Sequence, residues 1–368
     1  MAAGVDVCAT KPNMKRRTLW HDYRRQGTYM LTFVIEGRLP LLGRLQTASV
    51  SAESSAGAAA TVELTPLGRA IRDEEVRKIS LYYEMVEVWK LCIMPDHIHM
   101  IVRVKEDMPE GKHLGVIVRG FKGGCSRAWW RLQDEGAMPG RPCVETQGTV
   151  AAQGTVAATV PAVSTAGRTA GKAAGRTAGK PPRPSLFENG YCDKILLHEG
   201  QLDNWKHYLD DNPRRLAVKR LHPDYFTVMQ QVAIGEWKCQ AVGNRFLLDI
   251  PQKAAVIVHR AYSDAEYASL CQQWLACGEA GGVLVSAAIA PREKAVMRAA
   301  MDSGYRIILV RENGFPPLYK PAGESFEACS EGRLLQISPW EHHLGRRIIS
   351  REQCLQLNRL AALIADER

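Results

Sequence analysis

The chain has 368 residues, of which 46% are hydrophobic and 24% are charged, so it can bury sizeable cores, global disorder is excluded, and two domains are expected. No apolar run reaches the length of a membrane span, the N-terminus lacks a secretory signal, and the ten cysteines form no C-x-x-C pair, which together predict a reduced, cytoplasmic protein with no membrane partner. The net charge of +9 indicates a polyanionic partner. However, residues 136–184 alone carry six basic residues and one acidic residue, so much of the positive charge lies in this segment.

The first part of the chain has the pattern of an α+β unit. It predicts a strand over 28–37, a helix that follows Thr65 as its N-cap, strands over 86–94 and 97–104 joined by a tight turn, and a helix over 114–132. An extended piece over 193–198 and a helix over 199–211 follow. We expect that helix to end at Asn212-Pro213, because proline interrupts a helix and restricts the residue before it.

Two segments of this part lack hydrophobic periodicity. Residues 46–61 are small and polar and predict a flexible insertion. Residues 136–184 contain Gly/Ala/Thr near-repeats and predict a disordered low-complexity linker. Its lysines and arginines could contact nucleic acid. The alternative is that the segment is only a solubilising spacer. The predicted N-terminal domain therefore spans 1–135 and 185–225, with the linker inserted in it.

The C-terminal part, residues 240–368, has a different pattern. Apolar stretches typical of buried strands cover 254–260, 282–290, 306–313 and 333–339. Helical patterns over 263–280 and 291–304 alternate with them, and a closing helix follows Ser350. Such alternation implies right-handed crossovers and a mostly parallel sheet, so we expect an α/β domain.

Two histidines interrupt the apolar run MPDHIHMIV at 94–102. Because side chains alternate along a strand, His97 and His99 point to one face, while Ile98 and Met100 point to the other. Neutral imidazole is a common metal ligand, and this spacing lets two ring nitrogens reach one ion. Two strand histidines without a function, exposed or hydrogen-bonded, are the alternative.

The helix that ends near Asn-Pro adds two polar groups. Tyr208 and Asn212 are four residues apart and share one helix face, so a phenol and an amide could meet a site on the sheet. The alternative is that Tyr208 belongs to a core stripe with Leu202, Trp205 and Leu209, and that Asn212 only terminates the helix.

In this context MPDHIHMIV resembles the HUH motif of single-tyrosine transposases, in which two histidines flank a hydrophobic residue. YMLTFVIEGRLPLLG resembles the first strand of that family, and LFENGYCDKILLHEGQLDNWKHYLDDNPRRLAV resembles the nucleophile segment of its REP-associated branch. The resemblance covers residues 15–135 and 185–225 and implies a ferredoxin-like HUH fold. It also implies that His97, His99 and Asn212 hold Mg²⁺ or Mn²⁺ and that Tyr208 is the nucleophile, which would form a 5′-phosphotyrosine with single-stranded DNA.

Candidate DNA contacts come first from KRRTLWHDYRR near the N-terminus. Its cations can meet phosphates, and its rings can stack on an unpaired base. These residues are Lys15, Arg16, Arg17, Trp20, Tyr23, Arg24 and Arg25, with Lys122 and Arg127 as second candidates. A solvated N-terminus is the alternative. The resemblance implies a DNA substrate with a hairpin, and the sequence is compatible with a homodimer.

The C-terminal part resembles the Smf/DprA-type Rossmann-like DNA-processing fold over residues 240–345. The resemblance rests on GVLVS with the loop after it, Asn313-Gly314, Leu318-Tyr319 and the stretch Ser338-Pro339-Trp340-Glu341. Ser286, Arg292, Lys294 and Tyr319 are candidates for a ligand site at the carboxyl edge of the sheet. The stretch VHRAYSD lacks a glycine-rich phosphate loop, so a scaffold or docking domain is the alternative.

These patterns lead to one hypothesis and two rivals. The leading hypothesis is a metal-dependent endonuclease and strand transferase with a tyrosine nucleophile, acting on single-stranded DNA. One rival is a catalytically silent DNA-binding protein of the same fold. The other is a sensor that binds a nucleotide ligand through the C-terminal domain.

Overall fold

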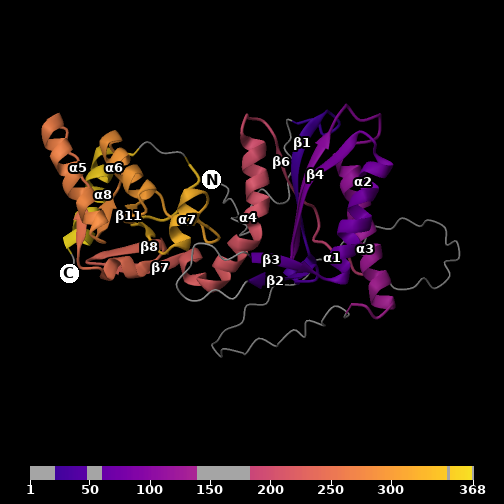
Figure 1. Ribbon diagram of the computed structural model, residues 1–368. Helices are drawn as coiled ribbons and strands as arrows, with labels where there is room; N and C mark the ends of the chain where they lie inside the picture. The colour runs from indigo at the N-terminus through magenta and orange to yellow at the C-terminus, as the bar shows by residue number, and fades with distance from the viewer. Residues whose placement is uncertain (1–20, 48–59, 139–182, 346–348, 367–368) are drawn as a thin grey trace, which may run out of the picture. The chain divides into compact units, whose positions relative to one another are not determined.

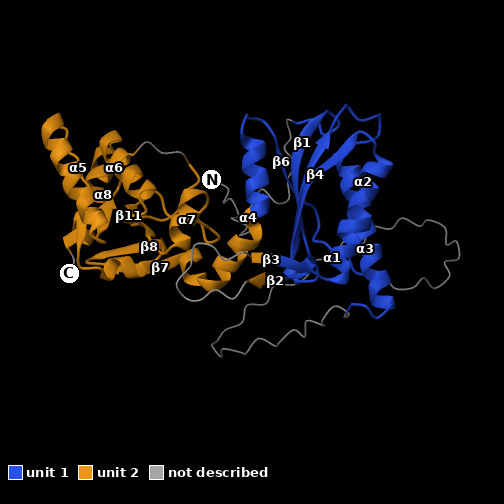
Figure 2. Ribbon diagram, in the orientation of Figure 1, with its two compact units in different colours: residues 1–45, 62–210 blue, residues 46–61, 211–368 orange. Residues whose placement is uncertain are grey.

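The computed structural model describes residues 21–47, 60–138, 183–345 and 349–366 (Figure 1). The chain divides into two compact units, one of residues 1–45 with 62–210 and the other of residues 46–61 with 211–368 (Figure 2). Both units mix helices and sheets, one sheet being antiparallel and the other mixed. Within the described ranges, no helix combines the length and the apolar character needed to cross a membrane.

The N-terminal unit is built on a four-stranded antiparallel sheet in the order β4-β5-β1-β6. The strands are β1 (Gly27–Val34), β4 (Val86–Met94), β5 (His97–Val104) and β6 (Cys192–Ile195). In the register of β1 and β5, Thr32 lies opposite His99, and Val34 lies opposite His97. The strands predicted over 86–94 and 97–104 are confirmed, with Pro95 and Asp96 as the turn between them, whereas the strand predicted over 28–37 ends at Val34, before a 3-10 turn.

Two helical segments cover one face of this sheet. The first consists of α1 (Pro66–Ala70), a π-helical turn (Ile71–Glu75) and α2 (Val76–Tyr82). Thr65 caps it, since its Oγ1 accepts a hydrogen bond of 3.2 Å from the backbone nitrogen of Gly68, as the sequence predicts. The second is α3 (Leu114–Asp134), also as predicted. A short pair of strands, β2 (Gly43–Thr47) and β3 (Ala60–Leu64), and a 3-10 turn (Glu36–Arg38) complete the described elements before α3.

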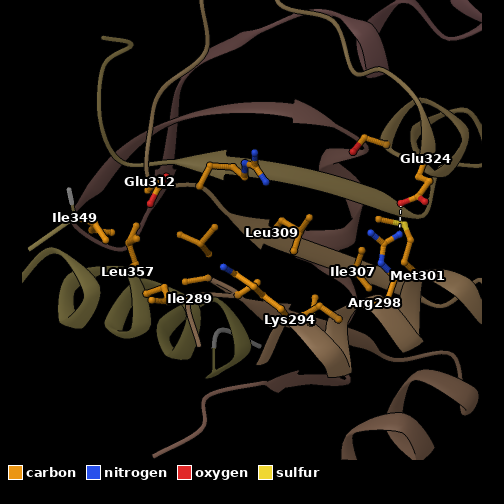
Figure 3. A pocket seen from close by; sticks show the side chains of 16 residues that line it. Ile289, Lys294, Arg298, Met301, Ile307, Leu309, Glu312, Glu324, Ile349 and Leu357 are labelled. Carbon is orange, nitrogen blue, oxygen red and sulfur yellow. Dashed lines mark hydrogen bonds and ion pairs between the residues drawn. The ribbon is translucent and has the colours of Figure 1, made fainter. Parts of the chain in front are cut away.

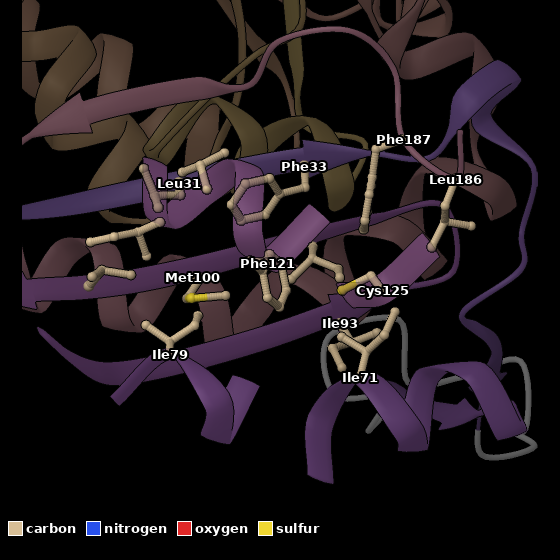
Figure 4. Close-up of a cluster of buried hydrophobic side chains, with 14 of the residues drawn as sticks. Leu31, Phe33, Ile71, Ile79, Ile93, Met100, Phe121, Cys125, Leu186 and Phe187 are labelled. Atoms are coloured by element: carbon tan, nitrogen blue, oxygen red, sulfur yellow. The ribbon is translucent and has the colours of Figure 1, made fainter. Parts of the chain in front are cut away.

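The core of the N-terminal unit lies between the sheet and these helices (Figure 4). Phe33 of β1 and Met100 of β5 face Phe121 and Cys125 of α3, and all four side chains are at least 95% buried. Burial of a side chain of this size contributes about 1.5–3 kcal/mol. The apolar face of β5 predicted from Ile98 and Met100 is therefore confirmed.

The first part of the helix α4 (Gln201–Leu221), up to Asp210, belongs to the N-terminal unit and covers the opposite face of its sheet (Figure 2). Trp205 and Leu209 pack on Met30 of β1 and Ile101 of β5, and all four are buried. Because Ile101 follows His97 and His99 at a spacing of two, the histidines share the face that α4 covers.

The predicted end of this helix at Asn212-Pro213 is wrong, since α4 continues to Leu221 with Pro213 inside it. Proline removes one backbone hydrogen bond of the helix. The residues after Pro213 are held by ion pairs instead: Arg214 and Arg215 both reach Asp211 and Glu327, and Arg215 lies 3.6 Å from the centre of the Phe326 ring. Of these partners, Glu327 and Phe326 lie more than a hundred residues beyond the window from which the helix end was predicted.

The C-terminal unit contains a six-stranded mixed sheet in the order β7-β8-β12-β11-β10-β9. The strands are β7 (Met229–Ile234), β8 (Trp237–Gly243), β9 (Lys253–Ala255), β10 (Val283–Ser286), β11 (Arg306–Val310) and β12 (Leu334–Ser338). The four strands from β9 to β12 run parallel, as the sequence predicts, while β8 pairs with β12 and β7 in antiparallel fashion. The strands β7 and β8 were not predicted, and β9, β10 and β11 end earlier than their predicted ranges.

Helices cover both faces of this sheet. They are α5 (Asp264–Glu279), α6 (Pro291–Asp302), α7 (Glu324–Ser330) and α8 (Arg351–Asp366), with 3-10 turns at Pro223–Phe226 and Arg245–Asp249. Val283 and Val285 of β10 share a core with α8, whereas Leu284 between them shares a core with α5 and α6. Burial on both faces explains why the strand is apolar at successive positions.

Candidate active site

His97 and His99 lie side by side on the face of β5 beneath α4. Their ring centres are 4.8 Å apart, and the planes are nearly perpendicular at 84°. The ring of Tyr208 approaches His99 from α4, with 5.6 Å between ring centres. The structure therefore brings together three of the predicted site residues within the N-terminal unit.

Tyr208 reaches this position because its neighbours anchor the helix. Trp205 and Leu209 form the buried stripe of α4, and Lys90 of β4 pairs with Asp210 at 2.6 Å. Tyr208 itself is 37% exposed, although the ring lies against His99. The core stripe that the sequence left open thus exists, but Tyr208 lies at its margin rather than inside it.

Each histidine uses its Nδ1 atom for an internal hydrogen bond. Nδ1 of His97 lies 2.7 Å from the Asp96 carboxylate, and Nδ1 of His99 lies 2.8 Å from the Thr32 hydroxyl. Within the described ranges, Nε2 of neither ring takes part in a hydrogen bond. A metal-binding histidine typically has this arrangement, because a partner on one nitrogen fixes the tautomer and directs the other nitrogen to the ion.

The electrostatics of the pair favour neutral imidazole at His99. Burial, with a smaller contribution from the charges of His97 and Lys194, lowers the pKa of His99 to about 3. For Asp96, burial raises the pKa, but the hydrogen bonds and charges of His97 and Arg38 outweigh burial and hold it below the ordinary value. The anionic Asp96 and the neutral His99 are the protonation states that a metal site requires.

The donor set fits a divalent cation only in part. Among the described residues there is no group of three or more His, Cys, Asp or Glu side chains that could hold a metal. Two imidazoles supply two ligands, so a third has to come from an amide, water or a substrate oxygen. Asn212 lies one helical turn beyond Tyr208 on α4 and is 8% exposed, and its amide nitrogen is buried without a hydrogen-bond partner in the described chain.

Three residues around the histidines were not predicted as site residues. Thr32 is a polar residue in the apolar strand YMLTFV. The sequence alone does not link it to the histidines, because only the register of β1 and β5 places it opposite His99. Asp96 was assigned only to a turn. Lys194 of β6 is exposed and close enough to influence His99 electrostatically, which no motif indicated.

The predicted DNA-contact residues have different surroundings. Lys15, Arg16, Arg17 and Trp20 lie outside the described residues. Tyr23 is 7% exposed and donates a hydrogen bond of 2.6 Å to Asp193, so its ring is not available to stack on a base. Arg24 is exposed and pairs with Asp22, and Arg25 is exposed.

Lys122 and Arg127 both lie on α3, on the far side of the sheet from the histidines. The ammonium group of Lys122 donates to the backbone carbonyls of Glu188 and Gly190, whereas Arg127 is exposed. His198 and His207, two histidines close to Tyr208 in the sequence, are both exposed.

The structure does not bring the four C-terminal candidates into one site. Ser286 is fully buried, donating to the carbonyl of Val256 and accepting from the backbone nitrogen of Ala288. Arg292 pairs with Asp264 and lies against the ring of Tyr267. The Tyr319 hydroxyl donates to Gln336 at 3.5 Å. These three side chains are engaged in internal contacts.

Glu293 occupies the position where a phosphate could meet the N-terminus of α6. It is 2% exposed, and its carboxylate accepts hydrogen bonds from the backbone nitrogens of Val258, Ile289 and Ala290. Backbone N–H groups at a helix N-terminus ordinarily attract an anion. Here the chain supplies that anion itself, in agreement with the missing glycine-rich loop.

Lys294, the fourth candidate, extends into a cavity of about 590 Å³ beside β10 and β11 (Figure 3). Arg298 and Arg311 also line the cavity, but so do Glu312 and Glu324, and Arg298 pairs with Glu324. The charges of the lining residues nearly cancel, so the cavity has no strong preference for a polyanion.

No family model matches the chain, and no curated protein matches it. The chain is similar to a solved structure of DNA processing protein A from Helicobacter pylori, described for its single-stranded DNA binding, at 19% identity and a TM-score of 0.28, over 39% of this chain and 68% of that chain. It is also similar to a REP-associated tyrosine transposase bound to a REP hairpin, at 10% identity and a TM-score of 0.27, over 55% and 74%. A third similar structure is described as a candidate transposase from Deinococcus radiodurans. The sequence identity is 12% and the TM-score is 0.24, and the match covers 53% of this chain and 96% of that chain. At these scores the likenesses are too loose to assign a function.

Proposed function

We propose that the protein is a metal-dependent endonuclease and strand transferase that cleaves single-stranded DNA with Tyr208 as the nucleophile. The observation that supports this proposal is the contact of the partly exposed Tyr208 ring with His99, which in turn lies beside His97, while Nε2 of neither imidazole has a partner among the described residues. The resemblance to the HUH family supplies the chemistry that such a group would carry out. The finer fold assignments, ferredoxin-like HUH and Rossmann-like, belong to the same proposal.

The proposed reaction exchanges one phosphoester for another. The Tyr208 oxygen attacks the phosphorus of a phosphodiester, the bond from phosphorus to the 3′-oxygen breaks, and the 5′ end of the downstream strand becomes linked to the tyrosine. The phenol proton passes to solvent, and the leaving 3′-oxygen takes up a proton to become a hydroxyl. Since the phosphotyrosine keeps the energy of the broken bond, the 3′-hydroxyl of another strand can reverse the step and join to it.

In this proposal, Nε2 of His97 and of His99 would hold Mg²⁺ or Mn²⁺, and the family resemblance implies Asn212 as the third ligand. When bound, the ion would polarise a non-bridging phosphate oxygen. Asp96 and Thr32 orient the two imidazoles, and burial keeps His99 neutral so that its nitrogen can donate an electron pair. Lys194 adds a positive charge on the same side of the sheet, which favours the phosphate.

The experiment is a search for the covalent adduct. A 40-nucleotide library of random sequence, labelled at its 3′ end, is incubated with the protein and Mn²⁺ and resolved on a denaturing gel. The random library removes the need to know the target, and the 3′ label stays with the fragment attached to the tyrosine. We expect a labelled protein band with the wild-type chain and none with Tyr208→Phe or in the presence of EDTA.

Tyr82→Phe is the matched control, because Tyr82 is also an exposed tyrosine on a helix of the N-terminal unit. It should form the adduct like the wild type. If the wild-type chain binds the library but forms no adduct with Mn²⁺ or Mg²⁺, the enzymatic proposal is wrong and a silent DNA-binding protein remains. The hairpin in the DNA and a homodimer are tested separately, by comparing recovered sequences and by light scattering.

A further inference from the structure

We propose that a groove along α3 binds the phosphate backbone of single-stranded nucleic acid, on the face of the N-terminal sheet opposite the histidine pair. The groove encloses about 720 Å³. Its α3 residues recur every three or four positions from Gly115 to Trp130, so they form one stripe along the helix. At 1.5 Å per residue this stripe is about 22 Å long.

The charges that line the groove all have one sign. Arg119, Lys122, Arg127 and Arg183 line it, and no carboxylate does. This distinguishes it from the C-terminal cavity, where two glutamates accompany three cations. A channel lined by one sign of charge attracts a ligand of the opposite sign.

Two of the four cations are available to a ligand. Lys122 donates to two backbone carbonyls, and Arg183 pairs with Asp134 at 2.9 Å. Arg119 and Arg127 are exposed, and neither forms an ion pair with another described residue. By contrast Arg131, one turn beyond Arg127, is paired with Glu74. The two arginines are eight residues apart, about 12 Å along the axis, so they can reach different phosphates.

Gly123 gives the groove its depth. A glycine inside a helix costs about 1 kcal/mol relative to alanine, and here no packing requires it. A Cβ at Gly123 would have Arg127 Nη1, at 3.4 Å, as its sole neighbour within 4 Å among the described atoms. The absent side chain instead lets a ligand approach the helix backbone between the two arginines.

Single strands are favoured over duplexes because a ring lies at the end of the stripe. Trp130 is half-buried, its indole N–H donates to the Pro184 carbonyl, and the Arg183 guanidinium lies 5.9 Å from its ring centre. An indole held in this way offers a platform for an unpaired base. Asn189 and Gly190 at the rim lead into β6, the edge strand that carries Lys194, so a strand passing around this edge would connect the groove with the histidine pair.

The inference goes beyond the proposed cleavage, because binding in the groove requires no reaction at Tyr208. It is therefore measured with Tyr208→Phe protein and a fluorescein-labelled dT30 oligonucleotide, by anisotropy over a range of salt concentrations. Arg119→Ala with Arg127→Ala should weaken binding at least tenfold at low salt. The slope of log affinity against log salt should become shallower by about 1.4, at 0.7 for each lost phosphate contact with a single strand.

Arg44→Ala with Arg77→Ala is the charge-matched control, since both arginines are exposed in the N-terminal unit, lie outside the groove and form no ion pair with described residues. It should leave the slope almost unchanged. An unchanged slope in the groove variant, an equal change in the control, or equally tight binding of a duplex of the same length would each overturn the proposal.

A second pair of variants separates the groove from folding. Gly123→Ala should keep or raise the melting temperature, because alanine favours the helix, yet weaken dT30 binding severalfold because its methyl group enters the groove. Gly120→Ala gives the same gain in helix propensity on the same helix, and its Cβ would meet no described atom within 4 Å. It should bind dT30 like the parent, and equal affinities for the two variants would contradict the role of Gly123.

Discussion

The two candidate sites, one on the sheet of each unit, differ in how their polar side chains are paired. In the N-terminal unit, His97 and His99 each hold one ring nitrogen with an internal partner and leave the other without one in the described chain, next to a partly exposed phenol. In the C-terminal unit, Glu293 accepts three backbone N–H groups, and Ser286 is satisfied on both sides. The histidines therefore keep a ring nitrogen that could bind a ligand, whereas Glu293 and Ser286 form their hydrogen bonds within the chain.

This difference teaches how a site can be told from a scaffold when both lie on a sheet. Buried polar groups are normally paired, so a paired group needs no ligand to explain it. A ring nitrogen that stays unpaired next to groups that orient its partner nitrogen does call for a ligand. The comparison predicts that substitutions in the C-terminal unit mainly change stability, and that those around the histidines mainly change metal binding.

The largest effect is expected from Glu293→Ala. Three partly buried backbone N–H groups would lose their charged acceptor, at about 1 kcal/mol or more each, so the C-terminal unit should lose about 3 kcal/mol of unfolding free energy. Urea unfolding followed by circular dichroism measures this loss. Glu279→Ala, at an exposed glutamate of α5, is the control and should change little. If the Glu293→Ala variant keeps its stability and gains phosphate binding, Glu293 blocks a ligand site. The contrast between the two candidate sites would then be wrong.

Acid should weaken the N-terminal unit through His99. Its pKa falls from about 6.5 in the unfolded chain to about 3 in the fold, so the unfolded state binds the proton more readily. The stability that His99 contributes is therefore complete above pH 6.5 and is lost as the pH falls toward 3. Linkage gives a loss of about 2 kcal/mol at pH 5. Unfolding measured in EDTA at pH 7.5 and pH 5 should reveal it, and His99→Gln should reduce the difference between the two values.

Much of the fold follows from local sequence, and the remainder depends on distant partners. The alternation in HIHMIV placed β5 and its apolar face correctly, and the Thr65 cap lies where predicted. The helix α4 passes Pro213 because Glu327, more than a hundred residues away, holds Arg214. No local rule for proline could include that ion pair. The strands β7 (MQQVAI) and β8 (WKCQAVG) are antiparallel and are interrupted by polar residues, so they lack the continuous apolar runs used to find the others.

The candidate site could also be predicted only in part, because some of its residues follow from local sequence and others depend on distant partners. The motif and the helix spacing identified His97, His99 and Tyr208 as candidates, and these rings do lie together. Thr32 is 67 residues from His99, and its role follows only from the register of β1 and β5. Tyr23 looked like a stacking residue, but a hydrogen bond to Asp193, 170 residues away, fixes it in the core. Pairings across such distances depend on the whole fold.

Asp96→Asn probes the orientation of His97 and should weaken Mn²⁺ binding about tenfold or more, the usual cost of losing a partner behind a metal ligand. The amide keeps a hydrogen-bond acceptor but removes the charge that steadies the Nδ1 proton. Isothermal titration with Mn²⁺ measures the change without any need for DNA. Asp73→Asn, at an exposed aspartate of the π-helical turn, serves as the control. Equal Mn²⁺ affinities for Asp96→Asn and wild type would contradict the role given to Asp96.

Thr32→Val should have the smallest effect, because the hydroxyl makes one neutral hydrogen bond to His99, worth about 1 kcal/mol. We expect a severalfold loss of Mn²⁺ affinity, and recovery in Thr32→Ser, which restores the hydroxyl. A role of Thr32 in packing alone predicts the opposite order, since valine preserves the shape of threonine and serine removes a methyl group. The ranking of valine and serine in the same titration therefore decides whether the hydroxyl orients His99 for a metal, as the contrast between the two units requires.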